Sequence, residues 1–255
     1  MRVKLTLRAL RRATLLPLNY QYAVASLIYT TLGSASTDFA AMLHDDGFRA
    51  DGRKFKLFTF SRLATERARV TGDQMLLEEP TVSLQVSSPV KDFVEHFVAG
   101  LFQSETFAIA GAHFNLEQAE TLPAPTFTNR MSFRALSPVT ESIGEGQKHP
   151  RFLSPDDDWS EIIRRNLIRK YHALNGHESV DTRLIWTWDQ AYLAEAARRG
   201  RRPSVLIDIR DTKIRGWLAP FTVEGSQELI ELGYEAGFGS RNSMGFGMAE
   251  AREGR

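Results

Sequence analysis

The chain has 255 residues, of which 42% are hydrophobic, so it can build one large domain or two of ordinary size. Its net charge of +1 gives no general sign of a nucleic-acid partner, and the lack of cysteine excludes disulfides, thiolate zinc sites and a cysteine nucleophile. No apolar stretch approaches the roughly 18 residues of a membrane helix, and the charged start does not resemble a signal peptide. We therefore expect a cytoplasmic protein with no membrane partner.

The first half of the chain alternates strand and helix patterns. Residues 17–33 are predicted to form a helix that begins at a proline and ends at a glycine. One face of this helix carries polar or small residues spaced four, three and four apart: Tyr22, Ser26, Tyr29 and Gly33. A second, short helix is predicted within residues 34–47, where Ser36 can cap its start. The other elements expected in this half are strands at 3–7, 55–63, 81–88 and 106–116, and a helix at 89–102.

The pattern restarts after a proline-containing linker at residues 122–126. The second half is predicted to contain strands at 126–136, 182–188, 204–210 and 243–250, and helices at 156–174 and 225–232. Each half thus has the order strand, helix, strand, strand, helix, strand, which is typical of a ferredoxin-like fold. We predict an α+β protein of two tandem ferredoxin-like domains, 1–122 and 126–255, with a glycine-rich loop at 233–247.

The glycine-rich loop allows several interpretations. A dinucleotide-binding motif needs G-x-G-x-x-G between a strand and a helix, but Asn242 stands where the third glycine belongs, and the helix comes first. A phosphate-binding loop would need Gly-Lys-Ser/Thr, which is absent. The remaining alternatives are a flexible hairpin, or a backbone whose N–H groups approach a polyanion with no Cβ in the way.

Two stretches of the sequence resemble the CRISPR-associated repeat-RNA endoribonucleases, the Cas-six family. They are "GYEAGFGSRNSMGFGMAE", with its two G-x-G pairs, and "LPLNYQYAVASLIYTTLG". The resemblance covers the whole chain and implies the same duplicated ferredoxin-like architecture. It also implies that the glycine-rich loop lies beside bound RNA, so we expect RNA contacts from Gly237, Gly239, Arg241, Asn242, Gly245 and Gly247.

The resemblance further implies metal-independent cleavage of the repeat RNA, with no cofactor. A 2′-hydroxyl attacks the adjacent phosphate, which leaves a 2′,3′-cyclic phosphate and a 5′-hydroxyl. By the match of "LHDDG…KLF", His44 is the general acid or base and Lys56 steadies the phosphate. By the match of "SLIYTTL", Tyr29 completes the catalytic triad. Lys54 is an alternative to Lys56. Histidine suits proton transfer because its pKa is near working pH. The spacing of the histidines predicts no metal site.

Two basic runs are candidates for RNA contacts beyond this site. One is the predicted helix with Arg164, Arg165, Arg169 and Lys170, in which Arg165 and Arg169 share a face. The other is a predicted loop with no acid inside it: Arg198, Arg199, Arg201 and Arg202. Either could instead be a solvated surface. Trp186 and Trp188 alternate onto one face of a strand and are expected in the core.

The leading hypothesis is therefore an endoribonuclease that matures CRISPR RNA, with repeat RNA as its partner. The alternative is a non-catalytic RNA-binding scaffold subunit of a CRISPR effector complex, which would share the fold and the loop without a functional triad. The oligomeric state is left open, with a homodimer as one option.

Overall fold

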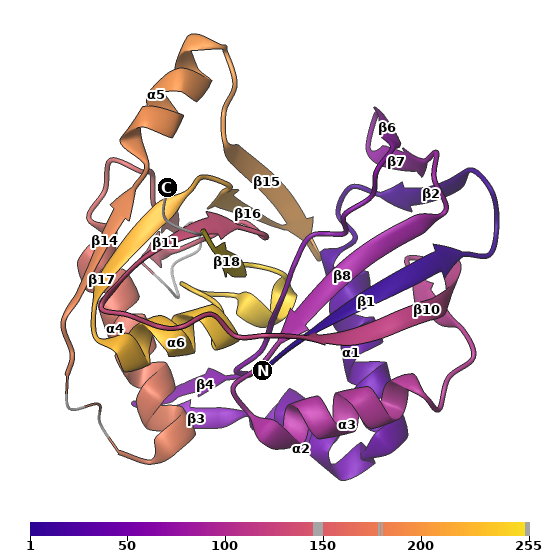
Figure 1. Cartoon of the computed structure of the whole chain (residues 1–255), viewed down its shortest axis with the longest axis horizontal. Coiled ribbons are helices and arrows are strands. Elements are labelled where there is room, and N and C mark those ends of the chain that lie inside the picture. Colours follow the sequence, from indigo (N-terminus) through magenta and orange to yellow (C-terminus); the bar gives the residue numbers. More distant parts are fainter. Residues whose placement is uncertain (145–149, 178, 180, 253–255) are drawn as a thin grey trace.

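Two antiparallel sheets, each covered on one face by helices, make up the computed structural model of the chain (Figure 1). The structure describes residues 1–144, 150–177, 179 and 181–252. Within them, no helix has both the length and the apolar character needed to cross a membrane.

The first sheet has the strand order β5-β8-β1-β10-β9. Its central strands alternate buried and outward residues, as the period of two requires. The strands are β1 (Arg2–Ala9), β5 (Thr59–Phe60), β8 (Thr81–Ser87), β9 (Phe107–Ile109) and β10 (Ala112–Leu122), and the helices are α1 (Gln21–Ala35), α2 (Thr37–Asp45) and α3 (Lys91–Leu101). In chain order β1, β5, β8 and β10 take the positions of the four strands of a ferredoxin-like fold.

The second sheet repeats this topology with the order β14-β17-β11-β18. Its elements are β11 (Arg130–Ala135), α4 (Trp159–Asn175), β14 (Leu184–Trp188), β17 (Phe221–Gly225), α6 (Gln227–Ala236) and β18 (Ala249–Ala251). The core is aromatic: Trp186 stacks on Phe221 with ring centroids 3.9 Å apart, and Trp188 is also buried. The α+β class and the duplicated ferredoxin-like fold are thus confirmed, as is the core position of both tryptophans.

Several predicted elements are wrong in detail. The third strand of the second sheet is β17, whereas residues 204–210 form β15 (Ser204–Ile209) in a separate hairpin with β16 (Thr212–Trp217). The tight turn between them is made by Arg210 and Asp211, both with positive φ. Such turns usually carry Asn-Gly, so the Arg-Asp sequence gives no signal of this one. The helix α5 (Gln190–Arg198) replaces a predicted loop.

Boundaries also differ in the first half. Pro17 ends the strand β2 (Thr14–Pro17), so α1 begins four residues later than predicted, and it continues past Gly33. Residues 106–116 contain the turn between β9 and β10, and residues 55–63 are not one strand. Small sheets accompany the two large ones. In one, β7 (Gln74–Leu77) pairs with both β2 and β6 (Ala68–Thr71); in others, β3 (Phe48–Ala50) pairs with β4 (Arg53–Phe55), and β12 (Ser142–Ile143) with β13 (Arg151–Phe152).

The glycine-rich loop lies between the two halves of the chain, in the contact region that we call the seam. It contains the short 3-10 helix η1 (Asn242–Met244), so the predicted strand at 243–250 is wrong except for its last two residues. Met244 packs against the apolar core of the first half, and Thr59 Oγ1 donates a hydrogen bond to Phe246 O at 3.0 Å. The buried Arg2 guanidinium donates to Tyr234 O and Ala249 O at 3.0 and 2.9 Å. These contacts join the two sheets.

Gly245 offers a test of this seam, with Gly111 as a matched control. Their φ values are +80° and +82°, but a Cβ on Gly245 would lie 2.5 Å from the Phe60 ring, whereas a Cβ on Gly111 would meet nothing within 4 Å. We expect Gly111→Ala to cost about 1–2 kcal/mol from backbone strain. Gly245→Ala should cost about 1–3 kcal/mol more, because it adds a clash. Urea unfolding followed by circular dichroism measures the difference, and equal costs would contradict close packing in the seam.

Candidate active site

Tyr29, His44 and Lys56 meet at one cavity of about 220 Å³. Its other lining residues come from the same face of α1 (Tyr22, Ala25 and Ser26) and from the glycine-rich loop (Ser243 and Met244). Both halves of the chain therefore build the cavity. Ser243 and Met244 were not predicted as site residues, although they lie inside the glycine-rich stretch that was singled out.

Helix α2 sets the position of His44. The Ser36 side chain caps its start by accepting from Phe39 N at 3.3 Å, and Leu43 anchors its last turn in the core. His44 follows Leu43 and points outward, with 69% of its side chain exposed. The ring contacts Tyr29 edge to face, with centroids 5.4 Å apart.

Asp45 holds one nitrogen of the His44 ring. His44 Nδ1 lies 2.7 Å from Asp45 Oδ1, and this hydrogen bond is the main cause that lowers the pKa of the Asp45 carboxyl. An ionised carboxylate can only accept, so Nδ1 carries a proton here. In the neutral ring the other nitrogen, Nε2, then has a lone pair available for a proton.

Lys56 is tied to the end of the same helix. Its Nζ donates to Leu43 O at 2.5 Å and to His44 O, carbonyls that the end of the helix leaves unpaired. Burial and the neighbouring Lys54 lower the pKa of Lys56. Lys54 donates instead to Asp45 O at 2.8 Å and does not line the cavity that holds Tyr29.

Tyr29 is half-buried beside Phe58, with ring centroids 5.7 Å apart. Burial raises the pKa of its phenol well above the usual value. The hydroxyl therefore stays neutral at working pH, so it can donate a hydrogen bond but does not act as a phenolate base.

A trough lined with basic side chains continues from this cavity. A second cavity, of about 510 Å³, shares Lys56 and Ser243 with it, and a third, of about 280 Å³, shares lining residues with the second. We call this surface the basic trough; its basic lining residues are Arg53, Lys54, Lys56, Arg165, Arg169 and Arg241, together with the buried Lys170. Two of them also face acids: Arg165 lies 3.4 Å from Glu161, and Arg169 lies 3.5 Å from Asp51.

The glycine-rich loop is mostly buried. Gly237, Gly239, Gly245 and Gly247 all have positive φ and little exposed surface, whereas Arg241 is exposed on the trough. The Asn242 side chain is used inside the protein: its Nδ2 donates to Phe238 O and Phe246 O, and its Oδ1 accepts from Lys170. RNA contact by the loop stays a prediction, with Arg241 as its most accessible side chain.

Two expectations about the basic runs are wrong. Lys170 is not a surface cation but is buried beneath the glycine-rich loop. The second run does face an acid, because Glu195 on α5 forms ion pairs with both Arg198 and Arg199. Glu195 lies just before the run in the sequence, within one helical turn of both arginines.

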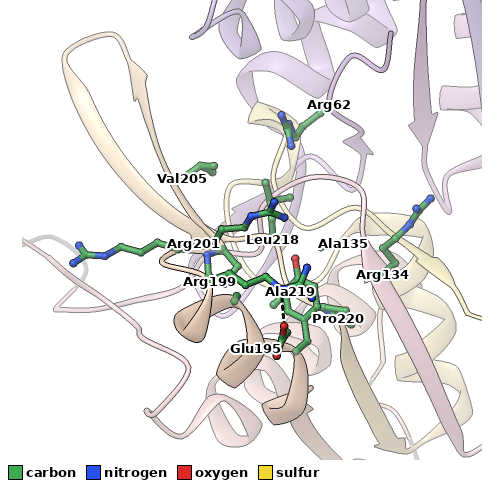
Figure 2. A pocket seen from close by; sticks show the side chains of 14 residues that line it. Arg62, Arg134, Ala135, Glu195, Arg199, Arg201, Val205, Leu218, Ala219 and Pro220 are labelled. Carbon is green, nitrogen blue, oxygen red and sulfur yellow. Dashed lines mark hydrogen bonds and ion pairs between the residues drawn. The ribbon is translucent and has the colours of Figure 1, made fainter. Parts of the chain in front are cut away.

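Arg199, Arg201 and Arg202 line a separate pocket of about 500 Å³ (Figure 2), which shares no lining residue with the basic trough. We call it the arginine pocket. Arg62 from the first half and Arg134 on β11 complete it, and Arg198 is not part of its lining. Figure 2 shows the Arg199 side chain turned toward Glu195, with Arg62 and Arg134 at other edges of the pocket.

Among the residues that the structure describes, no group of three or more His, Asp or Glu side chains could hold a metal ion. The ionisable side chains that line the cavity are the phenols of Tyr22 and Tyr29, the imidazole of His44 and the ammonium group of Lys56.

Two ferredoxin-like sheets with a glycine-rich loop between them define the class: double ferredoxin-like proteins. Two family models identify the family. "CRISPR associated protein Cas6, C-terminal" matches residues 122–251, and "CRISPR-associated protein Cas6, N-terminal" matches residues 15–120. The chain belongs to the Cas6 family.

Known proteins that are similar to the chain belong to the same family. The chain is 31% identical to "CRISPR-associated endoribonuclease Cas6 1" of Methanocaldococcus jannaschii, over 97% of this chain and 91% of that protein. It is 26% identical to "CRISPR-associated endoribonuclease Cas6" of Pyrococcus furiosus, over 94% and 84%. Among solved structures, a Cas6-related protein from P. furiosus superposes with a TM-score of 0.85 at 25% identity, over 100% of this chain and 99% of that one.

Proposed function

We propose that the chain is a metal-independent endoribonuclease that cuts CRISPR precursor transcripts within the repeat and so produces mature crRNA. The observation that carries the proposal is the meeting of Tyr29, His44 and Lys56 at one cavity between the two halves. Names of relatives support it, because several are CRISPR-associated endoribonucleases. A structure titled "An RAMP protein binding different RNA substrates", 25% identical with a TM-score of 0.81, supports RNA as the partner.

In the proposed reaction the 2′-oxygen forms a bond to the adjacent phosphorus, and the bond from phosphorus to the 5′-oxygen breaks. His44 acts as the base: Asp45 fixes the proton on Nδ1, so Nε2 takes the proton of the 2′-hydroxyl. The leaving 5′-oxygen takes a proton from solvent, and the products are a 2′,3′-cyclic phosphate and a 5′-hydroxyl.

Lys56 and Tyr29 stabilise the charge that develops on the phosphorus. Two carbonyls hold the Lys56 ammonium in place before substrate arrives, so little reorganisation is needed in the transition state. The neutral Tyr29 hydroxyl donates to a phosphate oxygen. Such interactions accelerate cleavage because they are stronger in the transition state than with the bound substrate.

The basic trough is proposed to carry the RNA next to the cleaved bond, because it is continuous with the cavity and exposes Arg165, Arg169 and Arg241. The arginine pocket, with Arg199, Arg201 and Arg202, is proposed to bind a more distant part of the repeat. Arg198 lies outside the pocket and is proposed to add only to the charge near it.

His44→Ala should lower the single-turnover cleavage rate by about two to four orders of magnitude, the usual effect of losing a positioned acid or base. The Kd for repeat RNA should change little, because one ring adds little to a polyanion contact. Tyr29→Phe should cost less than His44→Ala, since a hydrogen bond is lost but not the proton acceptor. Rates measured at saturating protein and Kd values from filter binding test both statements.

Lys54→Met is the matched control for Lys56→Met, because both lysines bond to carbonyls at the end of α2 but only Lys56 lines the cavity. At saturating protein, the loss of rate should be much larger for Lys56→Met than for Lys54→Met, because Lys54 lines only the basic trough. Normal cleavage by His44→Ala would contradict the assignment of the base. A wild-type protein that binds repeats and never cuts them would favour the alternative, a scaffold subunit of an effector complex.

Cleavage should persist in excess EDTA, because the groups assigned to the chemistry need no metal. A repeat with a 2′-deoxy nucleotide before the cut should bind and stay intact, since the nucleophile is missing. Gel analysis of end-labelled RNA measures both effects. Loss of activity in EDTA that magnesium restores would show that cleavage needs a metal. Cleavage of the deoxy substrate would show that water is the nucleophile.

Replacing Arg165, Arg169 and Arg241 by alanine should weaken RNA binding and flatten its dependence on salt. Each lost phosphate contact removes about 0.7 from the log–log slope for single-stranded RNA. Replacing Arg199, Arg201 and Arg202 should flatten the slope as well, but only the first variant should also slow the cleavage of bound RNA. Titrations from low to high salt measure the slopes, and an unchanged slope would place the RNA away from that surface.

A further inference from the structure

Lys170 is the buried cation at the centre of the glycine-rich loop. It lies on α4 with 2% of its surface exposed, and its Nζ donates to Gly237 O at 2.7 Å, Gly239 O at 2.8 Å and Asn242 Oδ1 at 2.7 Å. An ammonium group has three N–H donors and the loop supplies three oxygens. Every donor of the side chain is therefore used by the loop.

The three oxygens converge because of the backbone conformation of the loop. Gly237 and Gly239 have φ values of +88° and +74°, conformations that residues with a Cβ rarely adopt. Their carbonyl dipoles point toward one place, where they would repel one another without a cation between them. Buried oxygens left without a donor would cost further free energy.

Burial opposes this charge, and the neighbouring Glu141 favours it. Desolvation lowers the pKa of Lys170 below the usual lysine value, whereas the Glu141 carboxylate acts in the opposite direction. A neutral amine would offer only two N–H donors to the three oxygens. The ammonium form is the one that satisfies all three oxygens of the loop.

The glycine-rich loop connects Lys170 to the candidate active site. Asn242, which accepts from Lys170, also donates to Phe238 O and Phe246 O at 3.3 and 3.0 Å and begins η1. The next two residues, Ser243 and Met244, line the cavity of Tyr29, His44 and Lys56. Lys170 does not line that cavity, so its effect there must pass through the loop.

We propose that Lys170 is a positioning residue: its ammonium acts as an internal template that folds the glycine-rich loop and so holds Ser243 and Met244 as one wall of the active site. Arg241, which precedes Asn242, is held on the basic trough by the same template. The activity part of this proposal rests on the proposed endoribonuclease function, whereas the structural part does not.

Lys170→Met tests the template, because it keeps an unbranched side chain only one atom shorter and removes its donors. Leu167→Ala is the matched control: Leu167 lies one turn earlier on α4, is fully buried, and packs in the core of the second half. The first readout is amide hydrogen exchange of the loop. Its N–H groups form hydrogen bonds within the loop, such as Phe238 N to Gly247 O, and to its neighbours, such as Gly247 N to Pro138 O.

Lys170→Met should raise exchange selectively in residues 237–247, by about 10- to 100-fold, with β11 and β17 still protected. Leu167→Ala should raise exchange across the whole second half together, because it weakens a shared core. A loop that stays protected in Lys170→Met would overturn the proposal.

The second readout is single-turnover cleavage below the melting temperature of every variant. Lys170→Met should lose about 10- to 100-fold in rate, the size expected from a wall misplaced by about 1 Å, while the Kd for RNA changes less than about threefold. Leu167→Ala should cleave close to the wild-type rate. The double variant of Lys170→Met and Asn242→Ala should be no slower than the slower single variant, because both act through one loop.

A wild-type rate for Lys170→Met would overturn the positioning role. If Lys170→Met does not fold, Asn242→Ala alone removes one of the three acceptors and should give a smaller change of the same kind in both readouts; no change would likewise overturn the proposal. If the wild-type protein cleaves no repeat, the proposed function fails, while hydrogen exchange still decides whether Lys170 shapes the loop.

Discussion

At its four glycines, the backbone from Gly237 to Gly247 passes too close to its neighbours for a side chain to be added. A Cβ on Gly245 would lie 2.5 Å from the Phe60 ring, and one on Gly247 would lie 2.0 Å from Phe238 O. This close packing lets one loop contact the cores of both halves and still reach the cavity with Ser243 and Met244. The relation between the two sheets and the shape of the site therefore depend on the same ten or so residues of backbone.

The duplicated fold could be predicted because most strands and helices follow their ordinary periods, and because the same order of elements occurs twice. What failed was the choice between neighbouring strand candidates. The runs at 204–210 and 221–225 both have strand composition, but only β17 pairs with β11 and β14. Local sequence does not encode that choice, since it depends on which strand completes the central sheet.

The candidate triad could be inferred from motif positions, but its geometry comes from packing. Helix α1 places Tyr29, and the end of α2 places His44 and also binds Lys56 through its free carbonyls. Lys170 shows the opposite case: in the run "IRRNLIRKYH" it looks like one more solvated cation, yet the helix turns it inward beneath the loop. The acceptors that make its burial tolerable are about 70 residues away in sequence, so no local pattern could reveal them.

The seam also sets the order in which the protein can acquire its site during synthesis. Thr59 and Phe246, which bond across it, are 187 residues apart. A nascent chain can fold the first sheet and bring Tyr29, His44 and Lys56 together early, because domains generally fold as units from the N-terminal side. It still lacks the wall formed by Ser243 and Met244 until translation has passed them. An unfinished chain on the ribosome, surrounded by RNA, would thus carry these three side chains without the completed cavity.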